Sequence, residues 1–283
     1  MSDVKARIVV LFPLFNGEKS ILQSLQCIAN QTFTDFKAVI VENHSTDQSF
    51  KIAREFAATD SRFEVVQNEY HLDALTNFVD AIKAHQHLGK YLVLRAHDDF
   101  SAPNFLEELA KSLDENLTKN LAVCDTHYVK EGSVVEKTKL IPSLMSFREH
   151  LISNKAPRRL VFRAHWFYGM YRVGGGTETL LRLFPSLGTP WCSASVVVAE
   201  FIFREKIVHN PNTHFEFVLG SQSQQLYGIL PISQRLKRRY DYFMAIWKMK
   251  RFVEPLTFRQ RLKVFEIAWR DCKKKTGYYI WGM

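Results

Sequence analysis

The sequence lacks several features that would assign it to particular classes of protein. It has no run of 18 or more apolar residues, the length that a spanning helix requires, and no basic N-terminal segment leading into an apolar stretch. We therefore expect neither a membrane-spanning helix nor a signal peptide, and a cytoplasmic location. The four cysteines are far apart and form no CxxC pair, which indicates reduced, mostly buried thiols. No GxGxxG follows the first predicted strand, which argues against a dinucleotide-binding domain.

Basic residues are unevenly distributed. Residues 235–283 contain 14 of the 38 lysines and arginines but only 4 of the 29 acidic residues, so this segment carries +10 and the residues before it carry −1. The same segment is rich in aromatic residues, and we expect it to be a helical C-terminal extension. It is predicted either to pack on the core as a helical subdomain or to dock on an anionic membrane surface; a nucleic-acid patch is the third reading, and we expect no nucleic-acid partner.

Apolar strand patterns alternate with helical patterns over the first 113 residues. The predicted strands cover residues 7–12, 36–41, 63–66 and 91–94, and helices are predicted between them and after the last one. Four such alternations predict an α/β fold with a doubly wound, mostly parallel sheet flanked by helices. We expect one main domain at residues 1–234, with a ligand-binding half to residue 125 and a second half from residue 126.

Two adjacent carboxylates, Asp98 and Asp99, follow the strand predicted at residues 91–94. Ligands bind at the carboxyl ends of strands in open α/β sheets. Neighbouring carboxylates repel each other unless a cation lies beside them, and oxygen ligands suit Mg²⁺ or Mn²⁺ holding a diphosphate. A simpler role is helix capping before the helix that starts near Asn104.

Four segments together resemble the successive signatures of family 2 glycosyltransferases with the GT-A fold. They are VLFPLFN at residues 10–16, NQTFTDF at 30–36, VENHSTD at 41–47, and Asp98-Asp99 before Pro103. The resemblance implies an inverting transferase that uses a nucleoside-diphosphate sugar, with a UDP-sugar as the first candidate, and Mg²⁺ or Mn²⁺. The acceptor would be a saccharide or a lipid-linked molecule in bacterial surface polysaccharide or lipopolysaccharide synthesis.

The resemblance also implies roles for residues in the first two loops. Pro13, Leu14 and Phe15 would pack on the nucleotide base. The second loop usually begins Asp-Asp-Gly-Ser in the family, whereas Glu42 and Asn43 stand here. Asn43 would keep an acceptor for the base, and Glu42 would bind ribose hydroxyls.

Two further parts of the expected site, residues 69–77 and residues 96–99, depart more from the family pattern. His71 and Asp73 fall where the family touches the nucleotide, and Asp73 also suits a helix N-cap, which we favour. The family metal motif commonly reads Asp-x-Asp-Asp, but this chain has Ala96 at its start. Asp98 is therefore the expected metal ligand. His97 would contact phosphate or metal, or simply be solvated.

The position of the general base is the least regular part of the pattern. An inverting transfer needs a carboxylate on the acceptor side to take the proton from the attacking hydroxyl. Pro190 stands where the family places that Asp. Glu178 is the first candidate for the base, although a solvent-facing Glu in the first turn of a helix is an equal reading. Glu200 is the second candidate; Asp99 or a loss of catalysis is the third.

Two rival functions follow from these departures. A non-catalytic nucleotide-sugar-binding or scaffold protein of the same fold would explain the missing base. A sugar nucleotidyltransferase would require a Gly-rich basic loop after the first strand, which residues 13–17 do not form. The aromatic run at residues 165–172 resembles a strand beneath the acceptor site and equally suits core packing, and the glycines at 174–176 predict a flexible turn.

Overall fold

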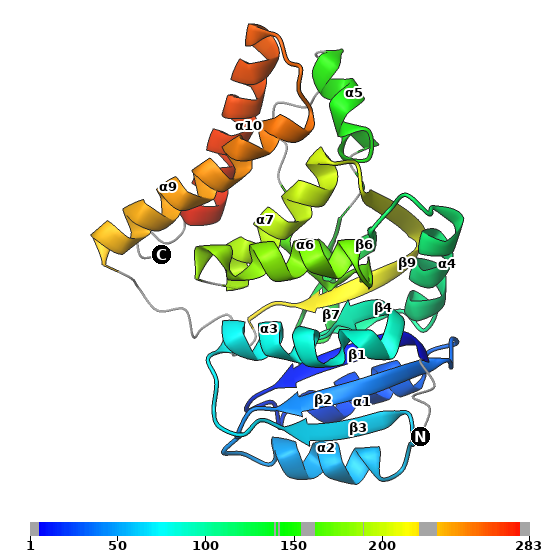
Figure 1. Cartoon of the computed structure of the whole chain (residues 1–283). Coiled ribbons are helices and arrows are strands. Elements are labelled where there is room, and N and C mark those ends of the chain that lie inside the picture. The colour runs from blue at the N-terminus through cyan, green and yellow to red at the C-terminus, as the bar shows by residue number, and fades with distance from the viewer. Residues whose placement is uncertain are drawn as a thin grey trace.

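The computed structural model describes residues 6–138, 140, 142–153, 162–188, 190–220 and 231–277. The first half has the predicted alternation of strands and helices (Figure 1). Its elements are β1 (Ala6–Leu14), α1 (Ile21–Ala29), β2 (Phe36–Glu42), α2 (Ser49–Ala57), β3 (Phe63–Gln67), α3 (Ala74–His85) and β4 (Gly89–Leu94). The four strands pair in parallel in the order β3-β2-β1-β4. The expected α/β sheet is thus confirmed.

The second half extends the same sheet to nine strands and adds antiparallel strands to it. Its elements are β5 (Phe100–Ser101), α4 (Phe105–Glu115), β6 (Leu121–Lys130), β7 (Ser133–Lys137), α5 (Phe147–Ile152), β8 (Met170–Arg172), α6 (Gly175–Leu183), α7 (Pro190–Phe203) and β9 (Ile207–Val218). β8 is antiparallel to both β4 and β6, and β9 is parallel to β6. Consequently β4, β6 and β9 all end at the same edge of the sheet, whereas β8 ends at the opposite edge.

Two apolar layers cover the two faces of the sheet. One cluster joins Leu11 and Leu94 to side chains of α3, α6 and α7, and the other joins Val10 and Val93 to side chains of α1 and α4. Alternate residues of each strand therefore enter opposite layers, as the pleat requires. Burying one such Leu or Val stabilises the fold by about 1.5–3 kcal/mol, so the central strands hold the loops at their ends in fixed positions.

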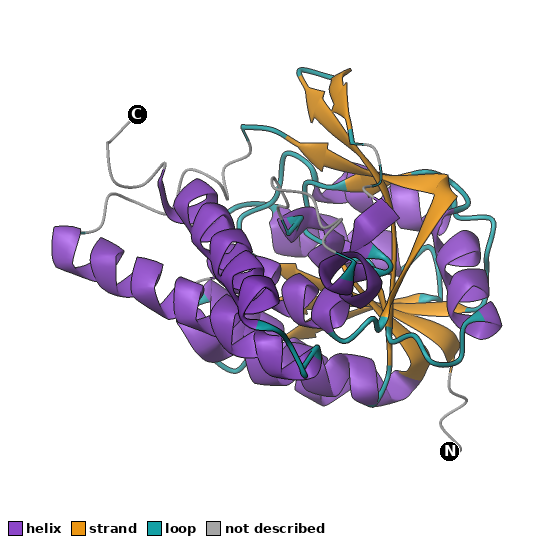
Figure 2. Cartoon of the chain, turned by 90° about the horizontal axis from the view of Figure 1, so that it is seen from above, coloured by secondary structure: helices purple, strands orange, loops and turns teal. Residues whose placement is uncertain are grey.

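The C-terminal segment contributes α9 (Ile232–Lys248) and α10 (Phe258–Gly277). Tyr242 and Ile246 belong to the same buried cluster as Leu11 of β1, and the Tyr242 hydroxyl donates to the buried carboxylate of Asp271. Figure 2 shows this helical layer beside the strands. Packing on the core accounts for these buried residues. Among the helices of the described ranges, none has the length and apolar character needed to span a bilayer.

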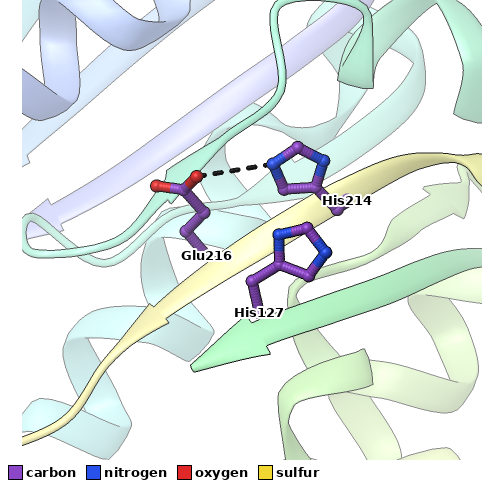
Figure 3. A group of neighbouring side chains, drawn as sticks. All are labelled: His127, His214 and Glu216. Atoms are coloured by element: carbon purple, nitrogen blue, oxygen red, sulfur yellow. Dashed lines mark hydrogen bonds and ion pairs between the residues drawn. The ribbon is translucent and has the colours of Figure 1, made fainter. Parts of the chain in front are cut away.

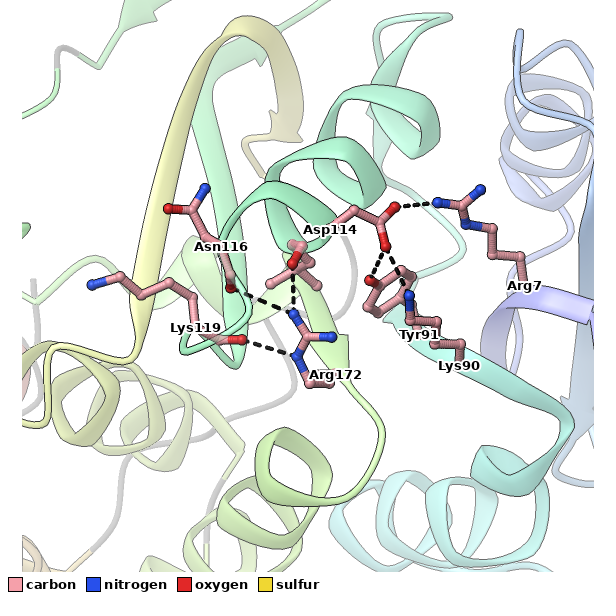
Figure 4. Close-up of polar contacts among 8 residues, drawn as sticks. Arg7, Lys90, Tyr91, Asp114, Asn116, Lys119 and Arg172 are labelled. Carbon is pink, nitrogen blue, oxygen red and sulfur yellow. Dashed lines mark hydrogen bonds and ion pairs between the residues drawn. The ribbon is translucent and has the colours of Figure 1, made fainter.

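A polar network fastens the C-terminal end of α4 to the edge where β4 begins (Figure 4). The Asp114 carboxylate accepts hydrogen bonds from Tyr91 at 2.7 Å and Lys90 at 2.8 Å, and it pairs with Arg7. These bonds outweigh partial burial and lower the pKa of Asp114 to about 2. Arg172 of β8 donates to the carbonyl oxygen of Leu113 at 2.6 Å. The network therefore ties four elements together at the edge away from Asp98.

The aromatic run at 165–172 differs from its predicted form. Residues Ala164–Tyr168 form a 3₁₀ helix, and only Met170–Arg172 form a strand. Trp166 is 3% exposed and its indole N–H donates to the carbonyl oxygen of Cys124 at 3.1 Å, so this ring belongs to the core. The glycines at 174–176 do not form a flexible turn: Gly174 caps α6 with φ of 92°, and the next two lie within that helix.

Candidate functional site

The loops that follow β1 and β2 are joined by side-chain to main-chain hydrogen bonds at the carboxyl edge of the sheet. The Asn16 side-chain oxygen accepts from the N–H of Thr46 at 2.8 Å, and the Asn16 N–H donates to Ser45 at 3.0 Å. The Gly17 N–H donates to the Ser49 hydroxyl at 2.7 Å. The two loops therefore form one rigid rim above the ends of β1 and β2.

The third loop, which connects β4 to β5, packs directly on this rim. A Cβ atom at Gly17 would lie 2.7 Å from the ring of His97, closer than any ordinary contact. His97 is held in place by a 3.0 Å hydrogen bond between its Nδ1 and the Ser20 hydroxyl. Position 17 thus requires glycine because the His97 ring occupies the space of a side chain. The structure brings the predicted residues Phe15, His97 and Asp98 to one edge.

Glu42 lies fully buried at the end of β2. Its carboxylate accepts from the main-chain N–H groups of Ser45 at 2.5 Å and His44 at 3.0 Å, and from the side chain of Gln67 at 2.9 Å. Burial raises the pKa of Glu42, but these hydrogen bonds outweigh it and the net pKa lies below the ordinary value. Glu42 therefore shapes the loop that was expected to hold the ribose.

Asn43 has a similar internal role. Its side-chain oxygen accepts from the Leu72 N–H and from the Asn68 side chain, both at 2.9 Å, and its amide donates to the Leu72 carbonyl at 2.8 Å. The side chain is buried, so Asn43 joins the loop after β2 to the segment before α3. That segment ends as predicted, because the Asp73 side chain accepts from the N–H groups of Leu75 and Thr76 and caps α3.

Two rings border the rim on its outer side. Phe15 is half-buried and lies against the exposed ring of His71, with centroids 4.6 Å apart and planes tilted by 49°. The Nδ1 of His71 forms a 3.0 Å hydrogen bond with the main-chain oxygen of Asn43. Pro13 and Leu14, by contrast, are buried at the end of β1, and the Leu14 carbonyl accepts from the N–H of Asn43 at 2.9 Å. Of the residues expected around the base, Phe15 and His71 present rings at the surface.

Asp98 and Asp99 differ in exposure. Asp98 is half-buried, whereas Asp99 is 3% exposed. Burial first, and then the charge of Asp98, raise the pKa of Asp99 well above its ordinary value; Arg95 and a hydrogen bond from the main chain of Val218 offset this in part. Asp98 is therefore the more accessible carboxylate and the one positioned to meet a cation, and Asp99 is turned toward β9.

Arg95 fixes the base of this loop from below. Its side chain is fully buried, and its guanidinium donates to the Phe100 carbonyl at 3.2 Å and to the Ser101 hydroxyl. It also lies over the rings of Phe105 and Phe215, at 4.9 and 5.2 Å from their centroids. A permanent cation thus underlies the loop that carries both carboxylates.

The donors at this edge fit the divalent ion that the resemblance implies. Asp98 offers an accessible carboxylate, and its charge raises the pKa of its neighbour, a repulsion that a cation relieves. One protein carboxylate suffices for Mg²⁺ when diphosphate and water supply the other oxygens. A second group, which the sequence analysis missed, is His127, His214 and Glu216 on β6 and β9. The His-x-Glu alternation at 214–216 was its only signal in the sequence.

The two glutamates considered as general base lie elsewhere. Because β8 runs opposite to β4, the start of α6 with Glu178 lies at the edge where β4 and β6 begin. Glu178 and Glu200 line a cleft of about 750 Å³ there with Arg182, Arg204 and Lys206. Glu200 is buried and paired with Arg182 and Arg204. The position of Glu178 contradicts its assignment as base, since the topology separates it from Asp98 by the length of the strands.

α7 begins at Pro190, as the helix-start pattern predicts. Thr189, expected as its N-cap, lies outside the described residues, as do residues 278–283 of the aromatic tail. The proline at the first position of α7 supplies no proton acceptor. The described part of the site therefore leaves Asp99 as the sequence-predicted carboxylate that adjoins Asp98.

Comparison with known proteins identifies the family of the chain. Residues 9–174, more than half of the chain, match the model of the family described as "Glycosyl transferase family 2". The chain belongs to glycosyl transferase family 2. The chain is 27% identical over 173 residues to the putative glycosyltransferase EpsH of Bacillus subtilis, covering 55% of this chain and 48% of that protein. It is 25% identical over 107 residues to an uncharacterized glycosyltransferase of Haemophilus influenzae, covering 38% and 32%. The chain thus spans a third to a half of these curated relatives.

Solved structures support the fold. The chain resembles residues 1–349 of TarS from S. aureus with a TM-score of 0.60 and 16% identity, covering 98% of this chain and 75% of that chain. It resembles the mannosyltransferase PcManGT from Pyrobaculum calidifontis, solved with GDP-Man and Mn²⁺, with a TM-score of 0.58 and 16% identity, covering 98% and 72%. These similarities confirm the GT-A fold of the glycosyltransferase.

Proposed function

We propose that this glycosyltransferase binds a nucleoside-diphosphate sugar at the edge formed by Phe15, His97 and Asp98 and transfers the sugar with inversion. The observation that carries the proposal is the convergence of three loops around Asp98, with Gly17 in contact with the His97 ring. Open α/β sheets bind ligands at this edge. Mg²⁺ or Mn²⁺ bound at Asp98 would supply positive charge to the leaving diphosphate.

A UDP-sugar is the proposed donor. TarS has been solved with UDP and with UDP-GlcNAc, at TM-scores of 0.54 to this chain. In this chain the polar atoms of Asn43 bind Leu72 and Asn68, so the shape of the loop rather than the Asn43 amide would select the base. The exposed His71 ring beside Phe15 offers a surface for stacking on a base.

Asp99 is the proposed general base. Its raised pKa makes the ionised carboxylate a stronger proton acceptor than an ordinary aspartate, and its hydrogen bond with Val218 turns it toward β9. It would take the proton of the acceptor hydroxyl while the acceptor oxygen bonds to the anomeric carbon and the bond between that carbon and the diphosphate oxygen breaks, so that the nucleoside diphosphate leaves. The proton then resides on Asp99 until solvent removes it.

The acceptor is proposed to be a saccharide or a lipid-linked molecule presented at the inner face of a membrane. One face of α10 carries exposed apolar side chains at helical spacing: Phe258, Leu262, Phe265 and Trp269 are 45–77% exposed. Basic residues such as Arg259 and Arg270 flank them. An apolar face bordered by positive charge suits peripheral contact with anionic lipids, and surface polysaccharide synthesis would use such contact.

Thermal melting with nucleoside diphosphates tests donor binding. We expect UDP with Mn²⁺ to raise the melting temperature, and UDP-sugar to be turned over when acceptor saccharides are supplied. Stabilisation by UDP without turnover or donor hydrolysis would favour the non-catalytic scaffold reading instead, and absence of stabilisation by any nucleoside diphosphate would contradict the proposed site.

Vesicle sedimentation tests the membrane contact. We expect the protein to bind vesicles that contain phosphatidylglycerol more strongly than vesicles of phosphatidylcholine alone. The double variant Phe258→Ser/Trp269→Ser should lose this binding while its melting temperature stays near wild type, because both side chains are at least half exposed. Equal binding by the variant and the wild type would contradict a role for this face.

A further inference from the structure

Three side chains with metal-binding chemistry meet on the strands next to the Asp98 loop. His127 of β6 and Glu216 of β9 are register partners, and His214 precedes Glu216 by two residues on the same strand face. One ligand atom from each lies within 4.8 Å of the others. Figure 3 shows the three side chains gathered above the strands.

The arrangement of the two rings brings their nitrogens together. The rings of His127 and His214 stack with centroids 4.0 Å apart and planes 22° apart, and the His214 Nε2 lies 3.4 Å from the Glu216 carboxylate. All three side chains are half-buried. An ion from solvent can therefore reach each side chain, while the strand that carries the side chain keeps it in position.

The chemistry of this donor set differs from that at Asp98. Two imidazoles and one carboxylate suit transition-metal ions, whereas Mg²⁺ prefers a shell of oxygens. Metal ions bind the neutral imidazole. Neutral rings stacked in this way can each offer an in-plane nitrogen lone pair to an ion bound at their edge.

The strand pairing places the group at the functional edge. Glu216 lies opposite Phe100 in the antiparallel pair of β5 and β9, and Phe100 follows Asp98 by two residues. His127 and Glu216 lie in the second half of the sheet, on the side of the proposed acceptor. An ion there would sit beside, not within, the expected site of the nucleotide diphosphate.

We propose that His127, His214 and Glu216 form a second metal site, selective for Zn²⁺ and related transition-metal ions over Mg²⁺ and independent of Asp98. The proposal does not rest on the proposed glycosyl transfer, because ion binding is measured without donor or acceptor. It predicts one bound transition-metal ion per chain in the absence of nucleotide.

Calorimetric titration of the chelator-treated full chain with Zn²⁺, and visible absorption with Co²⁺, test the site directly. The informative variants are His127→Gln, His214→Gln and Glu216→Gln, each checked for folding by its melting temperature. His87→Gln is the matched control, since His87 is exposed in the 3₁₀ helix Gln86–Leu88 that leads into β4, at the edge where β4 begins. Asp98→Asn separates the proposed site from the expected nucleotide site.

The wild type, His87→Gln and Asp98→Asn should bind Zn²⁺ alike and give the same Co²⁺ spectrum. Each of the three ligand variants should bind at least about tenfold more weakly, since even loss of a residue that only orients a ligand costs that much. Wild-type affinity in folded His127→Gln and His214→Gln would overturn the proposal, and so would a loss in Asp98→Asn as large as that in the ligand variants.

Discussion

Glu216 of β9 lies directly opposite Phe100 of β5 in an antiparallel pair. This pairing joins β9 to the strand that directly follows Asp98 and Asp99, so residues from the two halves of the chain meet at one edge. The first half supplies the rim of Phe15 and His97, and the second half supplies β9. Substitutions at this junction can be compared with substitutions at the opposite edge of the sheet, which serves as an internal control.

Replacing Asp99 with Asn tests the proposed base. Asp99→Asn should lower kcat by about 10²–10⁴, whereas Glu178→Gln should leave it near wild type because Glu178 lies at the other edge. Wild-type activity should rise with pH through a carboxyl pKa above the ordinary value of 3.8, since burial and Asp98 raise it. Near-wild-type activity of Asp99→Asn together with an inactive Glu178→Gln would contradict the assignment of Asp99 as base.

The same variant has an expected effect on stability. A raised folded pKa means that wild-type stability is present at low pH and is lost as pH rises through the pKa of Asp99. Asn carries no charge to bury, so Asp99→Asn should become more stable than wild type at neutral and higher pH. Urea unfolding across this pH range measures the difference, and a less stable variant throughout would refute it.

Gly17→Ala tests the contact between the first and third loops. The added methyl would lie 2.7 Å from the His97 ring, and overpacking of this kind costs about 1–3 kcal/mol. In the His97→Ala background the same change should cost far less, because the ring is gone. A double-mutant cycle by urea unfolding measures this coupling. Equal costs in both backgrounds would show that the two loops do not touch.

Asp114→Asn tests the network at the opposite edge. The pKa of Asp114 is lowered to about 2, so its contribution to stability is present above its ordinary value of 3.8 and is lost as pH falls toward 2. Allowing for solvent screening, the variant should be less stable at pH 7 by about 1–2 kcal/mol. This deficit should vanish at low pH while activity stays near wild type. A deficit that does not change with pH would contradict the charge-based account.

Local signals in the sequence predict the first half well. The runs of buried Val, Ile and Leu in β1, β2 and β4 are unambiguous because these parallel strands are buried on both faces. The cap of α3 is also predicted, since Asp73 and the following helical pattern define it within one turn. The carboxyl edge of the sheet then follows from topology alone, and Asp98 lies at that edge because it follows the end of β4.

The second half depends on contacts between distant residues, and there the sequence predicts less. The aromatic run around Trp166 suits a strand by composition, yet it forms a 3₁₀ helix because its rings fill the core. The reversed direction of β8 cannot be inferred from three residues, and this reversal moves Glu178 away from the site. His127 and Glu216 become neighbours only through the pairing of β6 with β9.

Calorimetric titration of UDP in the presence of Mn²⁺, with wild type and Asp98→Ala, shows whether Asp98 holds the metal ion that binds the diphosphate. We expect the variant to bind UDP at least about tenfold more weakly, on the order of 1.4 kcal/mol for one lost charge-assisted ligand, and wild type to lose the same affinity when Mn²⁺ is removed. Equal affinity of the two proteins for UDP with Mn²⁺ would contradict this role of Asp98.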